Sequence, residues 1–357
     1  MNEFLKWLSS NPILASALVS AITFLLITVA LMVTIAFFQG REVTFWPPKI
    51  GPRPVRDEKD PITPLQDNPF IQKGSILSTS TGDKVKISSN LAVSSNATLY
   101  KAKSLSTNEK VVVKVYWRGL RPNSLTWEFF KQNRRSFGFL THRNLVKTLD
   151  KGLYLGYPFI VMEYFSGGTL RDWLQMYDQL PGDDIFSIAS QIADAIDFLH
   201  SKGVIHRDIK PSNILLETNP QGRVVLGDFE VSRILGAVER NITAVDAESF
   251  VGTPIYIAPE VLMGQEITFA ADIYSFGVVL FEMISGCTPF SFNKSSGVIA
   301  LLQAKTQITA PEIRDYRKNV PENLAIRLAQ ALNIDPGLRP KSARAILSGL
   351  ETEITQL

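Results

Sequence analysis

Hydrophobic and polar positions divide the chain of 357 residues into regions of different texture. From Ile13 to Phe38, 26 consecutive residues carry no charge. As a helix this run would span about 39 Å, more than the ~30 Å hydrocarbon core of a bilayer. We therefore predict a tilted transmembrane helix over residues 12–38. The alternative is a cleaved signal peptide, which has an apolar region of only ~7–15 residues and a small-residue cleavage site; neither feature is found here.

Basic residues flank this apolar run unequally. Lys6 alone precedes it, whereas five basic residues follow it: Arg41, Lys49, Arg53, Arg56 and Lys59. The positive-inside rule therefore predicts a single-pass membrane protein, with residues 1–11 as a short outer segment and the C-terminal bulk in the cytoplasm. Prolines recur in residues 39–80, and this composition predicts an extended juxtamembrane linker.

After residue 80 the pattern changes to short, partly alternating runs that are rich in β-branched residues. The segments KVKISSNLAV (84–93), TLYKAKS (98–104) and KVVVKVYW (110–117) predict three antiparallel strands, and FIVMEY (159–164) predicts another. A helix is expected over about 124–140.

Helical periodicity dominates further along the chain. In the segment 184–203, apolar residues recur at the spacing of one helix face, and Gly203 ends the pattern. A run of strands followed by helices is typical of an α+β fold. We predict that residues 81–352 form one such domain, with a small β-rich lobe and a larger helical lobe.

Composition narrows the functional classes. The 37 basic and 34 acidic residues give a net charge of only +3, and no basic run interleaved with aromatic residues predicts nucleic-acid binding. Cys287 is the one cysteine, so the sequence excludes an internal disulfide and a cysteine metal cluster. A reducing compartment suits the folded part.

Three polar motifs follow one another in the helical half: HRDIKPSN (206–213), LGDFE (226–230) and GTPIYIAPE (252–260). Their order and spacing resemble the catalytic loop, magnesium motif and activation-segment end of the eukaryotic-type (Hanks-type) serine/threonine protein kinases. The resemblance covers about residues 84–350. The single membrane anchor joined to a kinase domain resembles bacterial members of this family. It implies a two-lobed kinase fold, ATP and Mg²⁺ as cofactors, and a protein hydroxyl as phosphoryl acceptor.

The resemblance also assigns roles to the residues nearest the chemistry. Asp208 would orient the substrate hydroxyl and accept its proton, and Lys210 would neutralise the γ-phosphoryl group. Asn213 and Asp228 would supply oxygen ligands to Mg²⁺, a cation that prefers such ligands. Lys114, which ends VVVK, matches the catalytic strand lysine that holds the α- and β-phosphates.

The expected nucleotide-binding loop, LAVSSNATLY (91–100), contains no glycine. Aligning LYKA with the family's VYKA places Ala92, Ser94 and Ala97 at the three glycine positions. A forced left-handed conformation costs roughly 1–2 kcal/mol per residue, which predicts weakened rather than abolished nucleotide binding. With the hinge segment MEYF, which would receive adenine through its backbone, the candidate nucleotide-binding residues on this side are Ala92, Ser94, Ala97, Leu99, Glu163 and Phe165.

Two further positions depart from the family pattern. Asn133 falls where a helix glutamate pairs with the strand lysine, and the nearest acid, Glu128, lies about 140° around the helix. Glu230 replaces the glycine that ends DFG. These departures leave a pseudokinase as the alternative to an active kinase, whereas the retained Asp208 and its neighbours favour the enzyme. A small-molecule phosphotransferase is disfavoured by GTPIYIAPE and by Asp272.

The remaining expectations concern support and regulation. Glu260 and Arg339 should form a buried pair, Asp272 should brace the catalytic loop, and Thr253 should help to seat a protein substrate. Ser249 is a candidate activation-segment phosphosite that could bind Arg207; the alternative is an unmodified loop serine. Small residues in the apolar run could pack two helices into a homodimer.

Overall fold

The computed structural model describes residues 43–45, 48–50, 71–93, 97–116, 140–229, 254–291 and 297–357. The chain divides into two units, Met1–Gln66 and Asp67–Leu357. In the first, β1 (Val43–Phe45) and β2 (Pro48–Ile50) pair as an antiparallel hairpin within the predicted linker. The predicted membrane span lies outside the described residues. None of the helices inside those ranges is long and apolar enough to cross a membrane.

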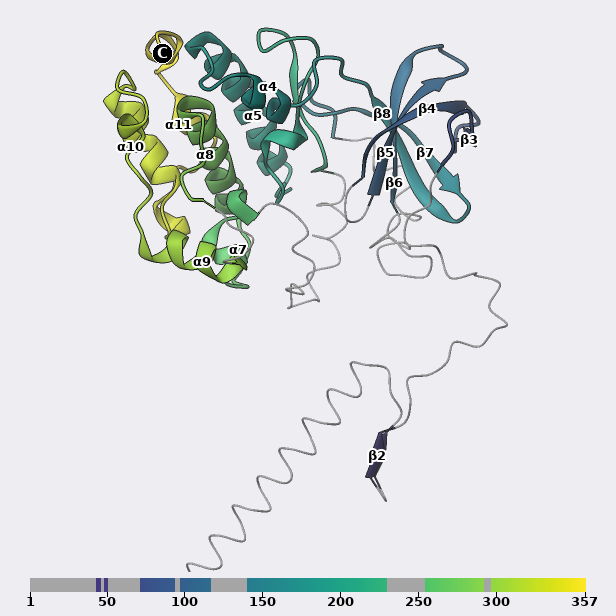
Figure 1. The fold of residues 1–357 in the computed structure, drawn as a ribbon, viewed down its shortest axis with the longest axis horizontal. Coiled ribbons are helices and arrows are strands. Elements are labelled where there is room, and N and C mark those ends of the chain that lie inside the picture. The colour runs from purple at the N-terminus through teal and green to yellow at the C-terminus, as the bar shows by residue number, and fades with distance from the viewer. Residues whose placement is uncertain are drawn as a thin grey trace, which may run out of the picture. The chain divides into compact units, whose positions relative to one another are not determined.

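The second unit begins with a six-stranded antiparallel sheet (Figure 1). Along the sheet the strands are β3 (Ile76–Ser78), β4 (Lys84–Val93), β5 (Ala97–Ser104), β6 (Lys110–Tyr116), β8 (Tyr157–Glu163) and β7 (Thr148–Tyr154). The four strands predicted from alternation are confirmed as β4, β5, β6 and β8. The helix expected over 124–140 lies almost wholly outside the described residues.

Alternation explains the two faces of β6. Val111, Val113 and Val115 are buried on one face, whereas Lys114 belongs to the other and therefore points toward the catalytic side of the sheet. Strand β3 extends the sheet beyond the predicted domain boundary at residue 81. The residues that follow β3 also contact β7, the strand at the other edge of the sheet. There the Ser80 N–H donates to the backbone oxygen of Lys151 (2.7 Å).

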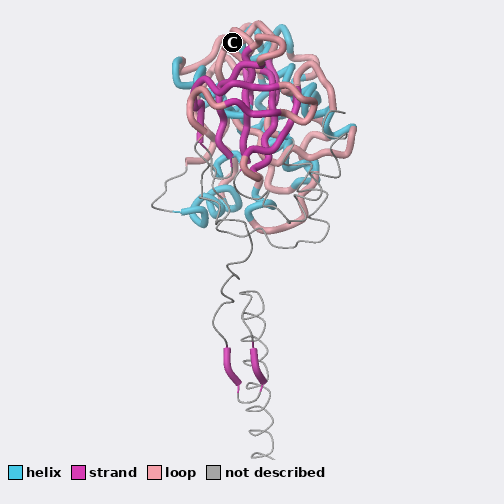
Figure 2. The backbone as a smooth tube through the Cα atoms, turned by 90° about the vertical axis from the view of Figure 1, so that its right-hand side faces the viewer, coloured by secondary structure: helices cyan, strands magenta, loops and turns pink. Residues whose placement is uncertain are grey.

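The helical lobe follows the sheet, and the two lie at opposite ends of the unit (Figure 1). Figure 2 views the unit from the sheet side, with the strands in front of the helices. The helices are α4 (Leu170–Met176), α5 (Gly182–Ser201), α7 (Pro259–Leu262), α8 (Phe269–Ser285), α9 (Gly297–Gln307), α10 (Glu322–Ala331), α11 (Arg344–Leu347) and α12 (Glu351–Thr355).

Helix α5 confirms the helix predicted over 184–203, and Gly203 follows it with φ +71°. The apolar face of α5 packs into one large core with α8, which is buried along almost its whole length. A two-stranded sheet, β9 (Ile214–Leu216) with β10 (Val224–Leu226), lies against α4 and α5. The 3-10 turn η2 (Pro211–Asn213) contacts α4, and the 3-10 turn η5 (Pro254–Tyr256) contacts α8 and α9. Two more 3-10 turns, η6 (Ile313–Asp315) and η7 (Pro336–Leu338), complete the lobe.

Candidate active site

One buried carboxylate, that of Asp272, binds the backbone of the catalytic loop. Asp272, near the start of α8, accepts the backbone N–H groups of His206 (2.7 Å) and Arg207 (2.8 Å). The same carboxylate lies 2.8 Å from Nε2 of His200 on α5. Arg207 has φ +69°, a conformation that non-glycine residues rarely adopt, and these bonds stabilise it. These hydrogen bonds confirm the predicted contact between Asp272 and the catalytic loop.

Two side chains converge on Asp208 just after this turn. The Lys210 ammonium donates to Oδ2 of Asp208 (2.7 Å), and the Asn213 amide donates to the same oxygen (2.9 Å) and to the Asp208 backbone oxygen (2.7 Å). The 3-10 turn η2 brings Asn213 back over the loop, with Pro211 at its first position. Three residues predicted from the motif therefore form one hydrogen-bonded cluster.

Asp228 lies two residues after the end of β10 and pairs with Lys114 on β6. The Lys114 ammonium is 2.5 Å from Oδ1 of Asp228. Burial by itself raises the pKa of Asp228, but the charge and hydrogen bond of Lys114, aided by Lys210, lower that pKa below its ordinary value. Asp228 therefore stays ionised, and its φ of +66° turns the carboxylate toward the site.

The donor set fits a magnesium ion bound together with phosphates. Asn213 uses its amide nitrogen for both bonds to Asp208, which leaves its oxygen as the atom for a cation, and Asp228 adds a carboxylate. Within the described ranges, no three His, Cys, Asp or Glu side chains cluster to hold a metal by themselves. Protein Mg²⁺ sites of this kind use one or two protein ligands together with substrate phosphates and water.

The glycine-free loop leaves β4 and returns as β5. Ala92 is exposed and pairs with Leu99, Ala97 is buried at the start of β5, and Ser94 lies outside the described residues. Neither Ala92 nor Ala97 has a positive φ. The left-handed strain expected at glycine positions therefore does not arise at these two residues.

The predicted hinge lies at the end of β8. The Glu163 side chain forms an ion pair with Arg223 (2.7 Å). Any contact between Glu163 and adenine would therefore use its backbone, as the sequence predicts. The Arg223 guanidinium also lies 5.4 Å from the centre of the Phe165 ring. Phe165 belongs to an apolar cluster with Ala97, and two partly buried residues pack against it: Val112 from β6 and Leu215 from β9.

Sequence reasoning did not single out Val112, Leu215 or Arg223. Val112 stands two residues before Lys114 on the same face of β6, a spacing that could have revealed it. No local signal links Arg223 to Glu163, because the two are sixty positions apart.

Beyond the catalytic loop, Glu260 and Arg339 form the predicted buried pair. The guanidinium binds both carboxylate oxygens, at 2.7 and 2.8 Å. Tyr256 connects this region to α8, because its hydroxyl donates to Glu282 (2.6 Å), which also binds Arg171 (2.8 Å). Burial and the Glu282 carboxylate both raise the pKa of Tyr256, so it remains a neutral donor.

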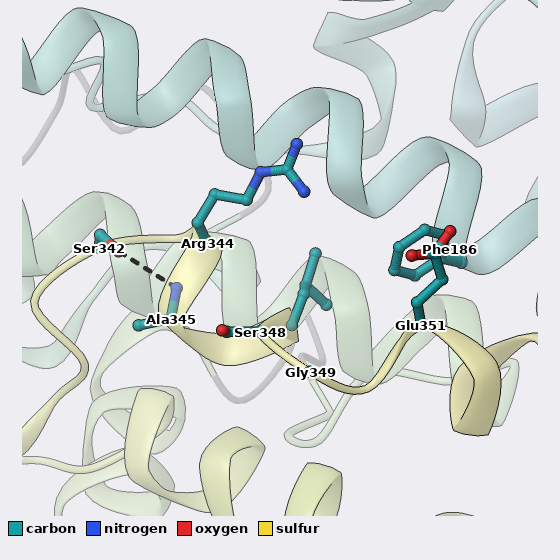
Figure 3. Close-up of a pocket in the computed structure, with 8 residues that line it drawn as sticks. Phe186, Ser342, Arg344, Ala345, Ser348, Gly349 and Glu351 are labelled. Atoms are coloured by element: carbon teal, nitrogen blue, oxygen red, sulfur yellow. Dashed lines mark hydrogen bonds between the residues drawn. The ribbon is translucent and has the colours of Figure 1, made fainter.

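Several predicted residues lie outside the described ranges: Ser94, Glu128, Asn133, Glu230, Ser249 and Thr253. Their assignments stay predictions. A pocket of about 470 Å³ opens elsewhere in the helical lobe, beside α11 (Figure 3). Phe186, Arg344 and Glu351 line it, and it contains none of the predicted site residues.

Comparison with known proteins agrees with this geometry. The model of the protein kinase domain family matches residues 89–349. A probable serine/threonine-protein kinase of Clostridium perfringens is 31% identical over 71% of this chain and 36% of its own length. Serine/threonine-protein kinase PrkC of Bacillus subtilis is 30% identical over 72% of this chain and 38% of its own length. The chain thus spans less than two-fifths of these relatives.

Among solved structures, the PknI kinase domain of Mycobacterium tuberculosis superposes with a TM-score of 0.59 at 20% identity, covering 80% of this chain and 99% of that domain. This likeness concerns the fold. The chain belongs to the protein kinase domain family, and its second unit has the two-lobed kinase architecture predicted from the sequence.

Proposed function

We propose that this protein is a serine/threonine protein kinase that transfers the γ-phosphoryl group of Mg-ATP to a protein hydroxyl. The observation that supports this most strongly is the cluster of Asp208, Lys210 and Asn213, in which both side-chain donors lie within 2.9 Å of Oδ2 of Asp208. A lysine two residues after the aspartate resembles the serine/threonine branch of the family.

The cluster suits the chemistry of phosphoryl transfer, which depends on positioning and charge neutralisation more than on covalent steps. Because Lys210 and Asn213 both bind Oδ2, Oδ1 of Asp208 remains to accept the proton of an incoming hydroxyl. Half of the Asp208 side chain is exposed, so a substrate can reach it. Lys210 would neutralise charge on the transferred group, and Lys114 would hold the other phosphates. When bound, Mg²⁺ would offset phosphate charge beside Asn213 and Asp228.

The test is phosphoryl transfer by the full chain with Mg²⁺ and γ-labelled ATP, beside an Asp208→Asn variant of nearly the same size. We expect label on protein serine or threonine with the parent, and a rate lower by at least about 10²-fold with the variant. Bound ATP without label in either protein would contradict the proposal and leave the pseudokinase alternative. Phosphopeptide mapping of the labelled parent tests Ser249: phosphate there supports the proposed Arg207 contact, and its absence from active protein removes it.

We also propose that residues 12–38 anchor the chain in a membrane with the kinase domain on the cytoplasmic side. The uncharged run of 26 residues and the excess of basic residues after it support this orientation. Liposome flotation should recover the full chain but not a chain lacking residues 1–38. Recovery of both, or of neither, would contradict the anchor. Cross-linking in the same liposomes tests the expected homodimer, which requires a product of twice the chain mass.

A further inference from the structure

A buried lysine outside the catalytic machinery holds the segment that follows Thr253. Lys305, in the last turn of α9, is only 4% exposed. Its ammonium donates to the backbone oxygens of Pro254 (3.4 Å), Ile255 (2.6 Å) and Ile257 (2.5 Å). Leu301, one helical turn earlier, is also buried. The face of α9 that carries Lys305 therefore packs against η5, and one side chain gathers three carbonyl groups of it.

The charged form of Lys305 matches this arrangement. An ammonium group has three donors, one for each carbonyl oxygen, whereas a neutral amine has two. Buried carbonyl groups without donors destabilise the conformation that holds them. Ile255 and Ile257 are partly buried, and Ile255 packs against the core of the helical lobe.

Besides the three carbonyl groups, an aromatic ring, a carboxylate and a guanidinium surround Lys305. Its ammonium lies 4.9 Å from the centre of the Tyr274 ring on α8, and the Arg339 guanidinium lies 4.9 Å from the same ring. Glu260 on α7 is the facing carboxylate, and Arg339 already binds both of its oxygens. Burial lowers the pKa of Lys305 to about 7; Glu260 opposes this shift and Arg339 adds to it. Lys305 therefore changes charge near neutral pH.

We propose that Lys305 is a positioning residue for the protein substrate: through three backbone carbonyl groups, its ammonium fixes the segment 254–257 in the conformation that receives the acceptor peptide. This rests on the proposed kinase function. The contacts of Lys305 are with this segment and the Tyr274 ring, and they do not include Lys114, Asp208 or Asp228. Its removal should therefore leave ATP affinity nearly unchanged. As pH rises, the ammonium loses a proton and Lys305 keeps two of its three donors. The segment 254–257 is then held less firmly, and acceptor binding weakens.

The experiment compares the full chain with Lys305→Met, which keeps the length of the stem, Lys305→Arg, which keeps the charge, and Lys318→Met, which removes an exposed lysine as the matched control. The acceptor is a degenerate mixture of serine and threonine peptides. The KM for the mixture, the kcat and the ATP dissociation constant are measured for each protein between about pH 6 and pH 8.5.

Lys305→Met removes all three donors. We expect it to raise the KM for peptide at least about tenfold, with ATP affinity changed less than about twofold. In the parent, KM should rise as pH passes 7, and in Lys305→Arg, which stays charged, this rise should vanish. Lys318→Met should behave as the parent.

Three results would overturn the inference: an unchanged KM in Lys305→Met, an equal loss of ATP affinity, or the same pH profile in Lys305→Arg as in the parent. If Lys305→Met does not fold, the pH profiles of the parent and the arginine variant still decide. A parent that transfers no phosphate refutes the proposed function instead, so the two failures are distinguishable.

Discussion

Two ion pairs of this protein differ in burial and in role: Glu260–Arg339 in the helical lobe and Lys114–Asp228 at the candidate active site. Arg339 and Glu260 are 0% and 2% exposed and bind through two parallel hydrogen bonds, whereas Lys114 and Asp228 are 6% and 33% exposed and share one short contact. The first pair has no access to solvent or ligand, so it can only support structure. In the second, Asp228 is partly exposed. Under the proposed function this pair would open, because phosphates would bind Lys114 and a cation would bind Asp228. An ion pair at the active site must separate when ligands bind, whereas an ion pair that supports the fold must stay closed.

The largest effect on stability should follow from breaking the fixed pair. Arg339→Met leaves the Glu260 carboxylate buried without a partner and should reduce the free energy of unfolding by about 3–5 kcal/mol in urea titrations. Arg344→Met is the control, because Arg344 also binds Asp194 through two contacts but the pair is 47% and 38% exposed. It should cost at most about 1 kcal/mol. Equal losses of unfolding free energy in the two variants would contradict the supporting role of the buried pair.

Asp228→Asn should have a smaller effect that depends on pH. The folded protein holds the pKa of Asp228 below its ordinary value of 3.8, so the ion pair contributes stability above that value and loses it as pH falls through the lower, folded-state pKa. At neutral pH the variant should lose roughly 1–3 kcal/mol, because Lys114 is left without this carboxylate. Acid titration of unfolding should be steeper for the parent. Parallel pH curves would show that Asp228 titrates as it does in the unfolded chain.

The smallest effects should come from restoring glycine to the loop. Ala92→Gly should change ATP affinity less than about twofold, because Ala92 is exposed and has no positive φ. Ala97→Gly removes a buried methyl group and should cost about 1 kcal/mol of unfolding free energy without improving ATP binding. Equilibrium ATP binding measures the affinity of both variants, and urea titration measures the stability of Ala97→Gly. A tenfold gain in Ala92→Gly would show instead that the missing glycine restricts the approach of phosphate.

Much of the fold follows from the sequence, since alternation in β4, β5 and β6 and the helical spacing in α5 dominate their segments. Strand β3 was missed because three residues with one inward side chain, Leu77, carry no usable period. At the site, the motifs predicted that Asp208, Lys210 and Asn213 act together, and the family resemblance predicted the pair Glu260–Arg339. The hydrogen bonds of Lys210 and Asn213 to Asp208 were not predicted. They could not predict that Lys305 is buried, because a lysine near a helix end is ordinarily solvated and only the packing of α9 on η5 removes it from water.

The exchange of partners at Asp228 can be tested directly by measuring the ATP affinity of the full chain with and without Mg²⁺, for the parent and Asp228→Asn. In the parent, Asp228 would hold Mg²⁺ and Lys114 would hold the phosphates, so adding Mg²⁺ should strengthen ATP binding by about tenfold or more. In the variant the gain should fall to about twofold or less. The same gain from Mg²⁺ in both proteins would show that Asp228 is not a metal ligand and would contradict this account of the site.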